Sequence, residues 1–242
     1  MKNEVWQKYI NIIVVAICVI AVATIIIFDP RKEYSLSPQT VYAKALSSVV
    51  ELKASSESVG ESYGSGVFVS SDGKLVTNAH VVTYKQMGIA HTFESYEIRF
   101  ANETDFHAVE LIQYDEQSDL ALLRLKENCT FTPVGFGSFE KLRSGSTVYA
   151  VGNALNHGIS ITQGIISVPL IQIENDNKVR AAIQCDLTIS EGNSGGALFD
   201  EKGKLVGITT FRTRDDKGNV VYGVAYCIPV NIVSDYIETN AA

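Results

Sequence analysis

The stretch CDLTISEGNSGGAL, residues 185–198, constrains this chain more than any other. At its centre Ser194 lies between Gly192-Asn193 on one side and two further glycines on the other. Glycines permit the tight positive-φ turn that exposes a serine together with neighbouring backbone N–H groups. A serine hydroxyl becomes an effective nucleophile beside a general base and beside donors that hold an oxyanion. The pentapeptide alone is equally compatible with a glycine-rich hairpin turn.

The pattern G-x-S-x-G also occurs at the nucleophile elbow of α/β-hydrolases, where a strand leads through the serine into a long helix. Here the serine is followed by ALF, a turn at residues 200–203, and a second apolar run at residues 205–208. Two short apolar runs around a turn predict a β-hairpin. The elbow interpretation is therefore rejected.

Two other segments supply the partners that such a serine needs. TNAHVV, residues 77–82, contains His80, and SDLALLRL, residues 118–125, places Asp119 before an apolar run. Each fragment has an ordinary explanation by itself, as a surface histidine or as an aspartate in a turn. Together they give the chain order His, Asp, Ser, which is that of chymotrypsin and differs from subtilisin and the α/β-hydrolases.

Longer stretches around these residues resemble the HtrA (Deg) trypsin-like serine proteases. The similarity covers roughly residues 41–236, and it is carried by GSGVFVSSDGKLVTNAHVV, SDLALLRL, SGSTVYAVGNALNHGISITQGIIS, IQCDLTISEGNSGGALFDEKGKLVGITT and GVAYCIPVNIV. The resemblance implies a serine endopeptidase acting in protein quality control or regulated proteolysis outside the cytoplasm. The alternative is a non-catalytic protein-binding or chaperone-like module on the same fold.

The resemblance also implies a role for each site residue. Ser194 would attack the peptide carbonyl to form an acyl-enzyme, His80 would carry the proton, and Asp119 would orient the imidazole. The oxyanion hole would consist of Gly192, Asn193 and Ser194, with the N–H groups of the first and third as donors.

Residues just before the nucleophile and on the following strand form the primary specificity pocket in this fold. Neutral and apolar side chains at the pocket base predict cleavage after small to medium aliphatic residues, because a buried cation would lack a partner. An inward-facing arginine would instead favour acidic residues, although a solvent-facing one is expected. The candidate substrate-binding residues are Thr188, Ile189, Ser190, Thr209, Thr210, Phe211 and Arg212.

Many short alternating strands with turn signals and little helical periodicity indicate an all-β fold. The resemblance implies a protease domain over residues 41–242 with two six-stranded antiparallel β-barrels of the chymotrypsin type. We place the first barrel at about 41–135 and the second at about 144–230. Residues 54–63 are expected to form a surface loop and residues 83–93 an insertion.

A long uncharged run predicts one N-terminal transmembrane helix before the barrels. Residues 9–28 carry no formal charge and are almost entirely apolar, and at about 1.5 Å per residue they match a hydrocarbon core of roughly 30 Å. A cleaved signal peptide is the alternative, but the A-x-A triplet at residues 21–23 is followed by further apolar residues. Residues 1–8 would form a short tail and residues 29–40 a tether.

Flanking charges do not fix the orientation of this expected signal anchor, because Lys2 and Lys8 precede it while Arg31 and Lys32 follow. The resemblance implies a single-pass membrane protein with the protease domain on the extracytoplasmic (periplasmic) side. It also implies unfolded or specific protein substrates and a possible homotrimer formed through the N-terminal segment. Tyr34 and Tyr42 are candidate trimer contacts. The chain ends at Ala242, and no PDZ domain is expected.

Composition argues against several other partners and cofactors. The formal net charge of −7 gives no electrostatic reason to expect nucleic acid binding. The four cysteines, Cys18, Cys129, Cys185 and Cys227, match no metal-binding spacing and form no disulfide framework. Cys185 and Cys227 are expected to be buried free thiols. We therefore expect neither a metal nor a cofactor.

Overall fold

The computed structural model describes the backbone of residues 2–27, 35–175, 177–214 and 220–240, and it divides the chain into two compact units. The first unit, Met1–Ser35, contains helix α1 (Lys2–Ile27). Within the described ranges, no helix is both long enough and apolar enough to cross a membrane. The transmembrane anchor expected over residues 9–28 is therefore not supported. Residues 28–34, which include Tyr34, lie outside the described residues.

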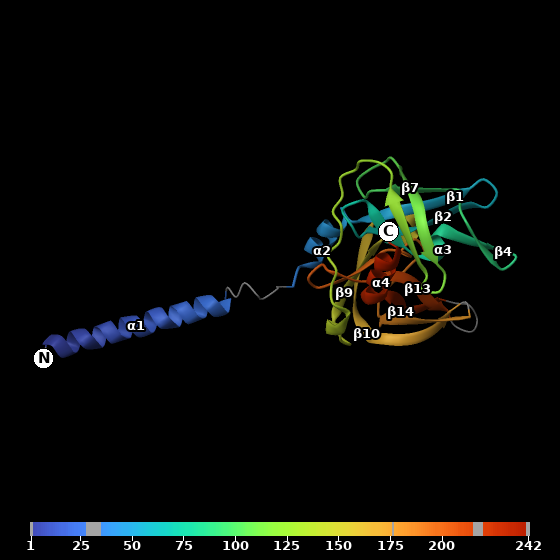
Figure 1. Ribbon diagram of the computed structural model, residues 1–242. Coiled ribbons are helices and arrows are strands. Elements are labelled where there is room, and N and C mark those ends of the chain that lie inside the picture. The colour runs from blue at the N-terminus through green and yellow to red at the C-terminus, as the bar shows by residue number, and fades with distance from the viewer. Residues whose placement is uncertain (1, 28–34, 176, 215–219, 241–242) are drawn as a thin grey trace. The chain divides into compact units, whose positions relative to one another are not determined.

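The second unit, Leu36–Ala242, contains two closed antiparallel barrels of six strands each (Figure 1). The first barrel has the strand order β1-β2-β3-β8-β7-β6 and the second β10-β11-β14-β13-β12-β9. The all-β, two-barrel prediction is thus confirmed. The strands are β1 (Val49–Ser56), β2 (Gly60–Phe68), β3 (Lys74–Thr77), β6 (Ser95–Arg99), β7 (His107–Asp115), β8 (Leu120–Leu125), β9 (Thr147–Gly152), β10 (Ser160–Asn175), β11 (Lys178–Cys185), β12 (Ala197–Asp200), β13 (Leu205–Arg214) and β14 (Val220–Pro229).

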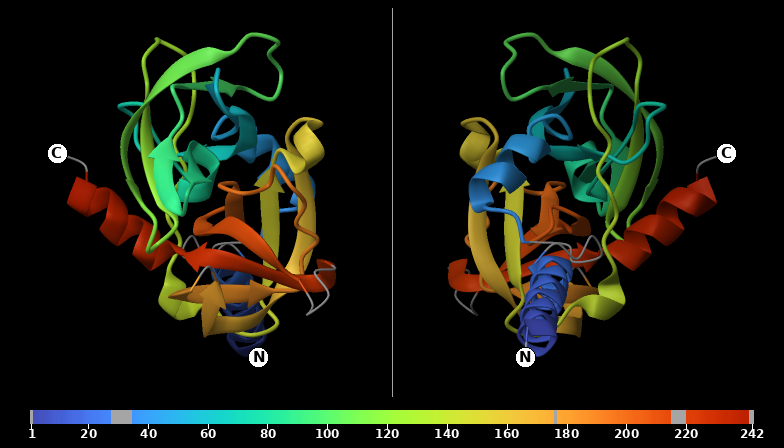
Figure 2. Two further views of the ribbon diagram at one scale, coloured as in Figure 1. Left: turned by 90° about the vertical axis from the view of Figure 1, so that its right-hand side faces the viewer. Right: turned by 90° about the vertical axis from the view of Figure 1, so that its left-hand side faces the viewer.

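Each barrel encloses its own apolar core, and a third core joins the two barrels. The central core combines Val67 and Leu120 of the first barrel with Tyr149 and Phe199 of the second. Alternate residues of a strand point to opposite faces, so one set of side chains fills the barrel while the other packs on its neighbour. The interface between the barrels therefore contains buried apolar side chains of both, and the ribbon shows the two barrels one against the other (Figure 2).

Two helices pack on this central core. Helix α2 (Pro38–Ala45) begins with a capping bond in which the Ser37 hydroxyl accepts the Thr40 N–H at 3.2 Å. Helix α4 (Val230–Asn240) closes the domain and buries Val233 in the same core. The Tyr42 hydroxyl of α2 donates to the Ile159 carbonyl at 2.7 Å. This candidate trimer contact therefore has a role within its own domain.

Two hairpins form in segments that were expected from the sequence to be a surface loop and an insertion. Residues 54–63, expected as a surface loop, instead extend strands β1 and β2, with Ser56 paired to Gly60. This segment consists almost entirely of small and polar residues, so its sequence lacks the apolar alternation that identifies a strand. The expected insertion forms strands β4 (Thr83–Gln86) and β5 (Ile89–Thr92). Met87 and Gly88 turn this second hairpin with φ values of 52° and 81°, as a two-residue hairpin turn requires.

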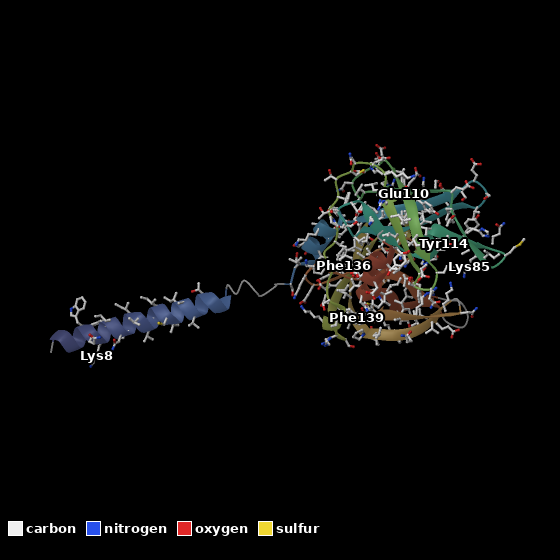
Figure 3. The ribbon with its side chains drawn as sticks, viewed as in Figure 1. Lys8, Lys85, Glu110, Tyr114, Phe136 and Phe139 are labelled. Carbon is white, nitrogen blue, oxygen red and sulfur yellow. The ribbon has the colours of Figure 1, made fainter. Side chains whose placement is uncertain are left out.

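The segment between β8 and β9 crosses from one barrel to the other. The Phe131 ring stacks on the Phe68 ring of the first barrel with centroids 4.2 Å apart. Further along, Phe139 packs against the apolar cores, while Phe136 is 39% exposed (Figure 3). These contacts fix the connecting segment to the domain over much of its length.

Candidate active site

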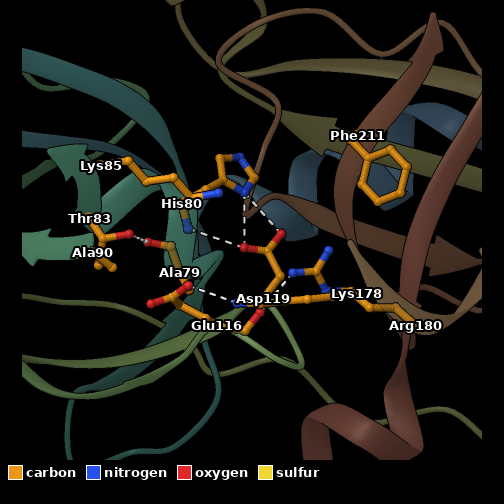
Figure 4. Close-up of a pocket in the computed structure, with 10 residues that line it drawn as sticks. All are labelled: Ala79, His80, Thr83, Lys85, Ala90, Glu116, Asp119, Lys178, Arg180 and Phe211. Atoms are coloured by element: carbon orange, nitrogen blue, oxygen red, sulfur yellow. Dashed lines mark hydrogen bonds and ion pairs between the residues drawn. The ribbon is translucent and has the colours of Figure 1, made fainter. Parts of the chain in front are cut away.

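His80 and Asp119 meet at the edge of the first barrel. The short helix α3 (Ala79–Val82) follows strand β3 and carries His80, while Asp119 precedes strand β8. The His80 Nδ1 atom lies 2.9 Å and 3.0 Å from the two carboxylate oxygens of Asp119 (Figure 4). The His80 backbone N–H donates to the same carboxylate at 3.1 Å. One carboxylate thus fixes both the backbone and the ring of His80.

Asp119 is held ionised although it is buried. Burial raises the pKa of its carboxyl, but His80, through its charge and its hydrogen bonds, and the Thr210 hydroxyl outweigh that cost and lower the pKa below its usual value. The Asp119 backbone has a φ of 56°, a left-handed conformation that aspartate tolerates better than most residues. Its carbonyl accepts the Ala79 N–H at 3.1 Å and the Asn78 amide at 3.0 Å.

Ser194 comes from the second barrel and reaches this pair through Thr210. The Ser194 hydroxyl donates to the Thr210 carbonyl at 2.8 Å. The Thr210 hydroxyl in turn donates to the Asp119 carboxylate at 2.7 Å. A cavity lined by both His80 and Ser194 lies beside them. The structure therefore brings together the three residues that the sequence singled out.

The turn around Ser194 requires glycine at two positions. Gly192 and Gly195 have φ values of 89° and 82°, which L side chains rarely adopt. A Cβ atom on Gly192 would lie 2.0 Å from the Asn153 carbonyl oxygen, and one on Gly195 would lie 2.2 Å from the Ser65 carbonyl oxygen. Both conformation and close packing therefore exclude any side chain.

The same turn leaves two backbone donors available. The N–H groups of Asn193, Gly195 and Gly196 donate to the carbonyls of Ser190, Thr209 and Asn193, respectively. Among the described residues, the N–H groups of Gly192 and Ser194 donate to no other protein atom. Two unused donors beside a serine hydroxyl are what the tetrahedral oxyanion of acyl transfer requires. Asn193, predicted with them, contributes its carbonyl and its N–H to the turn itself.

Ser65 of the first barrel stabilises this turn through hydrogen bonds. Its hydroxyl donates to the Gly192 carbonyl and accepts the Asn153 N–H, both at 2.8 Å, and its own N–H donates to the Ser194 carbonyl at 2.8 Å. The Thr77 hydroxyl donates to the Ser65 carbonyl at 2.7 Å. Ser65 is fully buried, so this network links the barrels out of contact with water. Sequence reasoning missed it, because a serine on a strand carries no distinguishing pattern.

A cavity of about 180 Å³ lies beside Ser194 and holds part of the predicted specificity pocket. Ile189 is buried within the core of the second barrel and also lines this cavity. Thr188 is exposed and lies outside it, and Thr209 is buried with its hydroxyl on the Asn193 carbonyl. The side chain of Arg212 lies outside the described residues. The full lining is His80, Ile189, Ser190, Glu191, Ser194, Thr210 and Phe211.

Glu191, a carboxylate at this cavity, was missed by sequence reasoning. It is exposed, and it also lines a second cavity of about 280 Å³ that reaches Ser194 and includes Tyr63 and Asn156. Its carbonyl accepts the Leu155 N–H at 2.7 Å. Glu191 precedes the glycine turn directly in sequence, and this adjacency is the signal that would have identified it.

A larger cavity of about 310 Å³ continues past His80 on the side of the β4–β5 hairpin (Figure 4). Lys85 and Ala90 of the hairpin line it on one side and Phe211 on the other. Lys178 and Arg180 of β11 add further positive charge, with Lys178 Nζ 2.7 Å from a Glu116 carboxylate oxygen. The hairpin that is longer than expected therefore walls a groove that begins at the histidine.

Comparisons with known proteins agree with this geometry. The family model described as trypsin-like peptidase domain matches residues 64–208. A probable periplasmic serine endoprotease DegP-like from Bartonella henselae is 37% identical over 73% of this chain and 33% of its own length. Serine endoprotease DegS from Haemophilus influenzae is 32% identical over 72% of this chain and 49% of its own length.

A solved structure of HtrA-type protease AlgW with tripeptide superposes with a TM-score of 0.71 and 27% identity, covering 84% of this chain and 63% of that one. The chain thus spans between about a third and a half of the two curated relatives. The matched family region contains all three residues of the candidate site. The chain belongs to the family of trypsin-like peptidase domains, and within it is similar to the HtrA-type serine endoproteases.

Proposed function

We propose that this protein is a serine endopeptidase that hydrolyses peptide bonds of proteins through His80, Asp119 and Ser194. The observation that carries this proposal is the turn around Ser194, where two unused N–H groups lie next to a serine that shares a cavity with a carboxylate-bound histidine. A binding module would have no need for an oxyanion site. Family membership and the endoprotease relatives support the same activity.

The reaction would follow from the geometry in two halves. Ser194 Oγ forms a bond to the peptide carbonyl carbon while His80 takes its proton, and the oxyanion is held by the N–H groups of Gly192 and Ser194. Collapse of this intermediate breaks the C–N bond, and His80 gives the proton to the leaving amine. Water then attacks the acyl-enzyme by the same route and releases the acid.

Asp119 would act by holding the histidine rather than by taking a proton. Its carboxylate contacts Nδ1, so the other ring nitrogen, Nε2, is the one that exchanges a proton with Ser194. The lowered pKa of Asp119 keeps it negative throughout the neutral range, which stabilises the imidazolium that forms on His80. Thr210 maintains this arrangement by occupying a further lone pair of the carboxylate.

Specificity would favour small to medium aliphatic residues before the scissile bond. The cavity beside Ser194 measures about 180 Å³ and presents Ile189 and Phe211, which suits a short apolar side chain. Its carboxylate, Glu191, is exposed at the surface, so water screens its charge. A buried lysine or arginine side chain would find no desolvated partner there.

We place this activity outside the cytoplasm, on unfolded or specific proteins, because the curated relatives include proteases described as periplasmic. A homotrimer is a further expectation by resemblance, and sedimentation velocity of the chain tests it directly. A non-catalytic binding or chaperone-like role is the alternative function, and it predicts an intact fold without a reactive serine.

Covalent labelling distinguishes the two functions. A fluorophosphonate probe should label the wild-type chain at Ser194 in a one-to-one ratio, and the Ser194→Ala variant should remain unlabelled. Labelling is expected to fall in a His80→Ala variant as well, because the serine then lacks its base. Absence of labelling in a folded wild-type protein, with no cleavage of casein, would contradict the endopeptidase proposal and favour the non-catalytic alternative.

A further inference from the structure

A second cluster of reactive side chains lies on the first barrel, among residues that the proposed protease mechanism does not use. His107, Glu127 and Cys129 each place one potential ligand atom so that all three atoms lie within 4.8 Å of one another. The Nδ1 atom of His107 is 2.9 Å from a Glu127 carboxylate oxygen and 3.4 Å from the Cys129 sulfur. A nitrogen, an oxygen and a sulfur donor therefore converge on one point.

Strand pairing explains why these residues meet although they are distant in sequence. In the β7–β8 ladder Val109 is opposite Leu125, so two residues further along each strand His107 faces Glu127. The Lys126 N–H donates to the Ala108 carbonyl at 3.1 Å and continues the ladder beyond β8. The cluster is thus built on a barrel strand and its backbone pairing, which fixes it better than a free loop would.

Packing against the first barrel fixes Cys129 next to His107. Its side chain is partly buried and packs against the apolar core of the first barrel, as does that of the neighbouring Phe131. The Phe100 ring meets the His107 imidazole edge to face at 5.8 Å. Packing therefore limits the rotamers of both the thiol and the imidazole, so little reorganisation is needed for them to act together.

Glu103 completes the arrangement around His107. One of its carboxylate oxygens lies 2.8 Å from His107 Nε2, the ring nitrogen that points away from the cluster. Metal-binding histidines almost always donate their second N–H to a carboxylate, a carbonyl or water, which fixes the tautomer and directs the other lone pair at the metal. Here that lone pair would belong to Nδ1, between Glu127 and Cys129.

We propose that His107 Nδ1, the Glu127 carboxylate and Cys129 Sγ bind one Zn²⁺ ion, with Glu103 as the carboxylate behind the histidine and a water as fourth ligand. Imidazole, thiolate and carboxylate are the three ligand types that zinc uses in proteins. Tetrahedral bonds of standard length place nitrogen and oxygen ligands about 3.3 Å apart and nitrogen and sulfur ligands about 3.6 Å apart. The observed separations of 2.9 Å and 3.4 Å are a few tenths of an ångström shorter.

Charge also favours a divalent cation at this point. Zinc binding converts the Cys129 thiol to a thiolate with release of its proton, and it displaces any proton carried by His107 Nδ1. One thiolate and one ligating carboxylate then neutralise the two charges of the ion. The sulfur and nitrogen donors select zinc over calcium and magnesium, which prefer oxygen ligands.

The positions of the three ligands in the chain mean that a bound ion would stabilise the fold. Glu127 and Cys129 open the segment that crosses between the barrels, whereas His107 begins strand β7. Zinc would therefore tie the start of the crossing segment to the first barrel, without contacting His80 or Ser194. Stability should rise with zinc concentration, since an ion that binds only the folded chain raises its melting temperature.

The test uses the full chain carrying His80→Ala, which removes the second histidine–carboxylate pair found among the described residues as a source of zinc binding. Calorimetric titration with Zn²⁺ should give one equivalent, and Co²⁺ should produce the absorption of a tetrahedral ion with a thiolate charge-transfer band. Adding His107→Ala or Cys129→Ser should weaken binding at least 100-fold, and Cys129→Ser should abolish the charge-transfer band. Glu103→Gln should weaken binding 10- to 100-fold, the range typical of such supporting carboxylates.

Matched controls are available on the same chain. Cys18→Ser removes an exposed thiol, and Glu110→Gln removes an exposed carboxylate on β7 (Figure 3); neither should change the zinc affinity. X-ray absorption of the zinc-loaded chain should show one sulfur ligand, and this holds even if a variant fails to fold. Absence of binding, an affinity unchanged by His107→Ala, or a shell of nitrogen and oxygen only would overturn the proposal. None of these outcomes bears on peptidase activity, so the two proposals fail separately.

Discussion

The Ser194 hydroxyl donates its hydrogen bond to the Thr210 carbonyl, and the Thr210 hydroxyl donates to Asp119. Thr210 therefore contacts both ends of the proposed catalytic group, although it is neither nucleophile, base nor acid. A hydroxyl has one proton to donate, so Ser194 must turn away from Thr210 before it can give that proton to His80. In the proposed mechanism the observed arrangement would be a resting one, and a rotation of the Ser194 side chain would lead to the reactive one.

The first prediction concerns the three proposed catalytic residues. Ser194→Ala and His80→Ala should each remove nearly all cleavage of casein, because the nucleophile or its base is lost. Asp119→Asn should lower kcat on the order of 10⁴-fold, since the amide stabilises the wrong imidazole tautomer. Circular dichroism should show an unchanged fold in the Ser194→Ala variant. Cleavage by that variant at the wild-type rate would show that another residue is the nucleophile.

The second prediction concerns Thr210. Thr210→Val preserves the shape of the side chain but leaves Asp119 without one of its donors, and a hydrogen bond to a charged group contributes about 1.5–3 kcal/mol. We expect kcat/KM to fall roughly 10- to 150-fold. Thr210→Ser restores the hydroxyl and should recover most of the activity. Equal activity in the valine and serine variants would rule out a positioning role for this hydroxyl.

The third prediction separates crowding from backbone strain in the glycine turn. Gly192→Ala would force a Cβ atom to within 2.0 Å of the Asn153 carbonyl, so the turn must move and the oxyanion donors with it. Gly145 has a similar φ of 87°, but a Cβ atom added there would meet no described atom within 4 Å. Gly145→Ala should therefore cost only the strain of a left-handed residue, about 1–2 kcal/mol, and keep full activity. Gly192→Ala should lose activity by at least the roughly 10²-fold expected for one oxyanion donor.

The fourth prediction is a loss of stability at alkaline pH that depends on Tyr96. Burial raises the pKa of its phenol to about 12, and the single proton of the hydroxyl lies within hydrogen-bonding distance of both the Val82 and the Phe93 carbonyl. The unfolded chain ionises this tyrosine near pH 10, so its neutral form stabilises the fold below pH 10. That contribution is lost as the pH rises from 10 to 12, at about 1.4 kcal/mol per pH unit.

Tyr96→Phe tests this assignment by removing one titrating group. Urea unfolding at several pH values between 9 and 12 should show a slope shallower by about one proton than that of the wild type. Burial also raises the pKa of Tyr236, so the variant should retain part of the slope. An identical pH dependence in variant and wild type would be inconsistent with a buried neutral phenol at position 96.

The fifth prediction is the cleavage preference. A peptide library should be cut most efficiently after valine, alanine or isoleucine, because the cavity at Ile189 is small and apolar on that side. Ile189→Ala enlarges the cavity and should shift the preference toward larger aliphatic residues. Strong cleavage after lysine or arginine would mean that Glu191 governs the pocket, and Glu191→Gln should then abolish it.

Sequence patterns predicted the features that are encoded by residues close together in the chain. The all-β class follows from short alternating strands with turn signals, the two-barrel arrangement from the family resemblance, and the three site residues from short segments in a fixed chain order. The hairpin arms at residues 54–63 resemble a loop in sequence, because their side chains are small or polar even where they are buried, as at Ser56, and the apolar alternation on which strand prediction depends is missing. The expected transmembrane helix rested on apolar composition alone, and the described part of α1 does not support it.

Contacts between distant residues were the part that the sequence could not provide. Ser65 and Gly192 are 127 residues apart, and only the packing of two barrels shows that they are hydrogen-bonded. The proposed zinc ligands carry no sequence signal for the same reason, because strand register and not spacing brings His107 to Glu127. Thr188 is predicted in the pocket from its position before the nucleophile, yet it faces solvent, since the chain there alternates between buried and exposed side chains.

Because the site is divided between two barrels, it becomes complete only late in the synthesis of the chain. His80 and Asp119 belong to the half of the chain that leaves the ribosome first, whereas Ser194 follows roughly 75 residues later, about 4 to 15 s at ordinary elongation rates. Until the second barrel closes, the histidine has no serine to activate and the glycine turn has no Ser65 contact to hold it. Under the proposed function, a growing chain would therefore be unable to cut its neighbours on the same messenger until its own second barrel had folded.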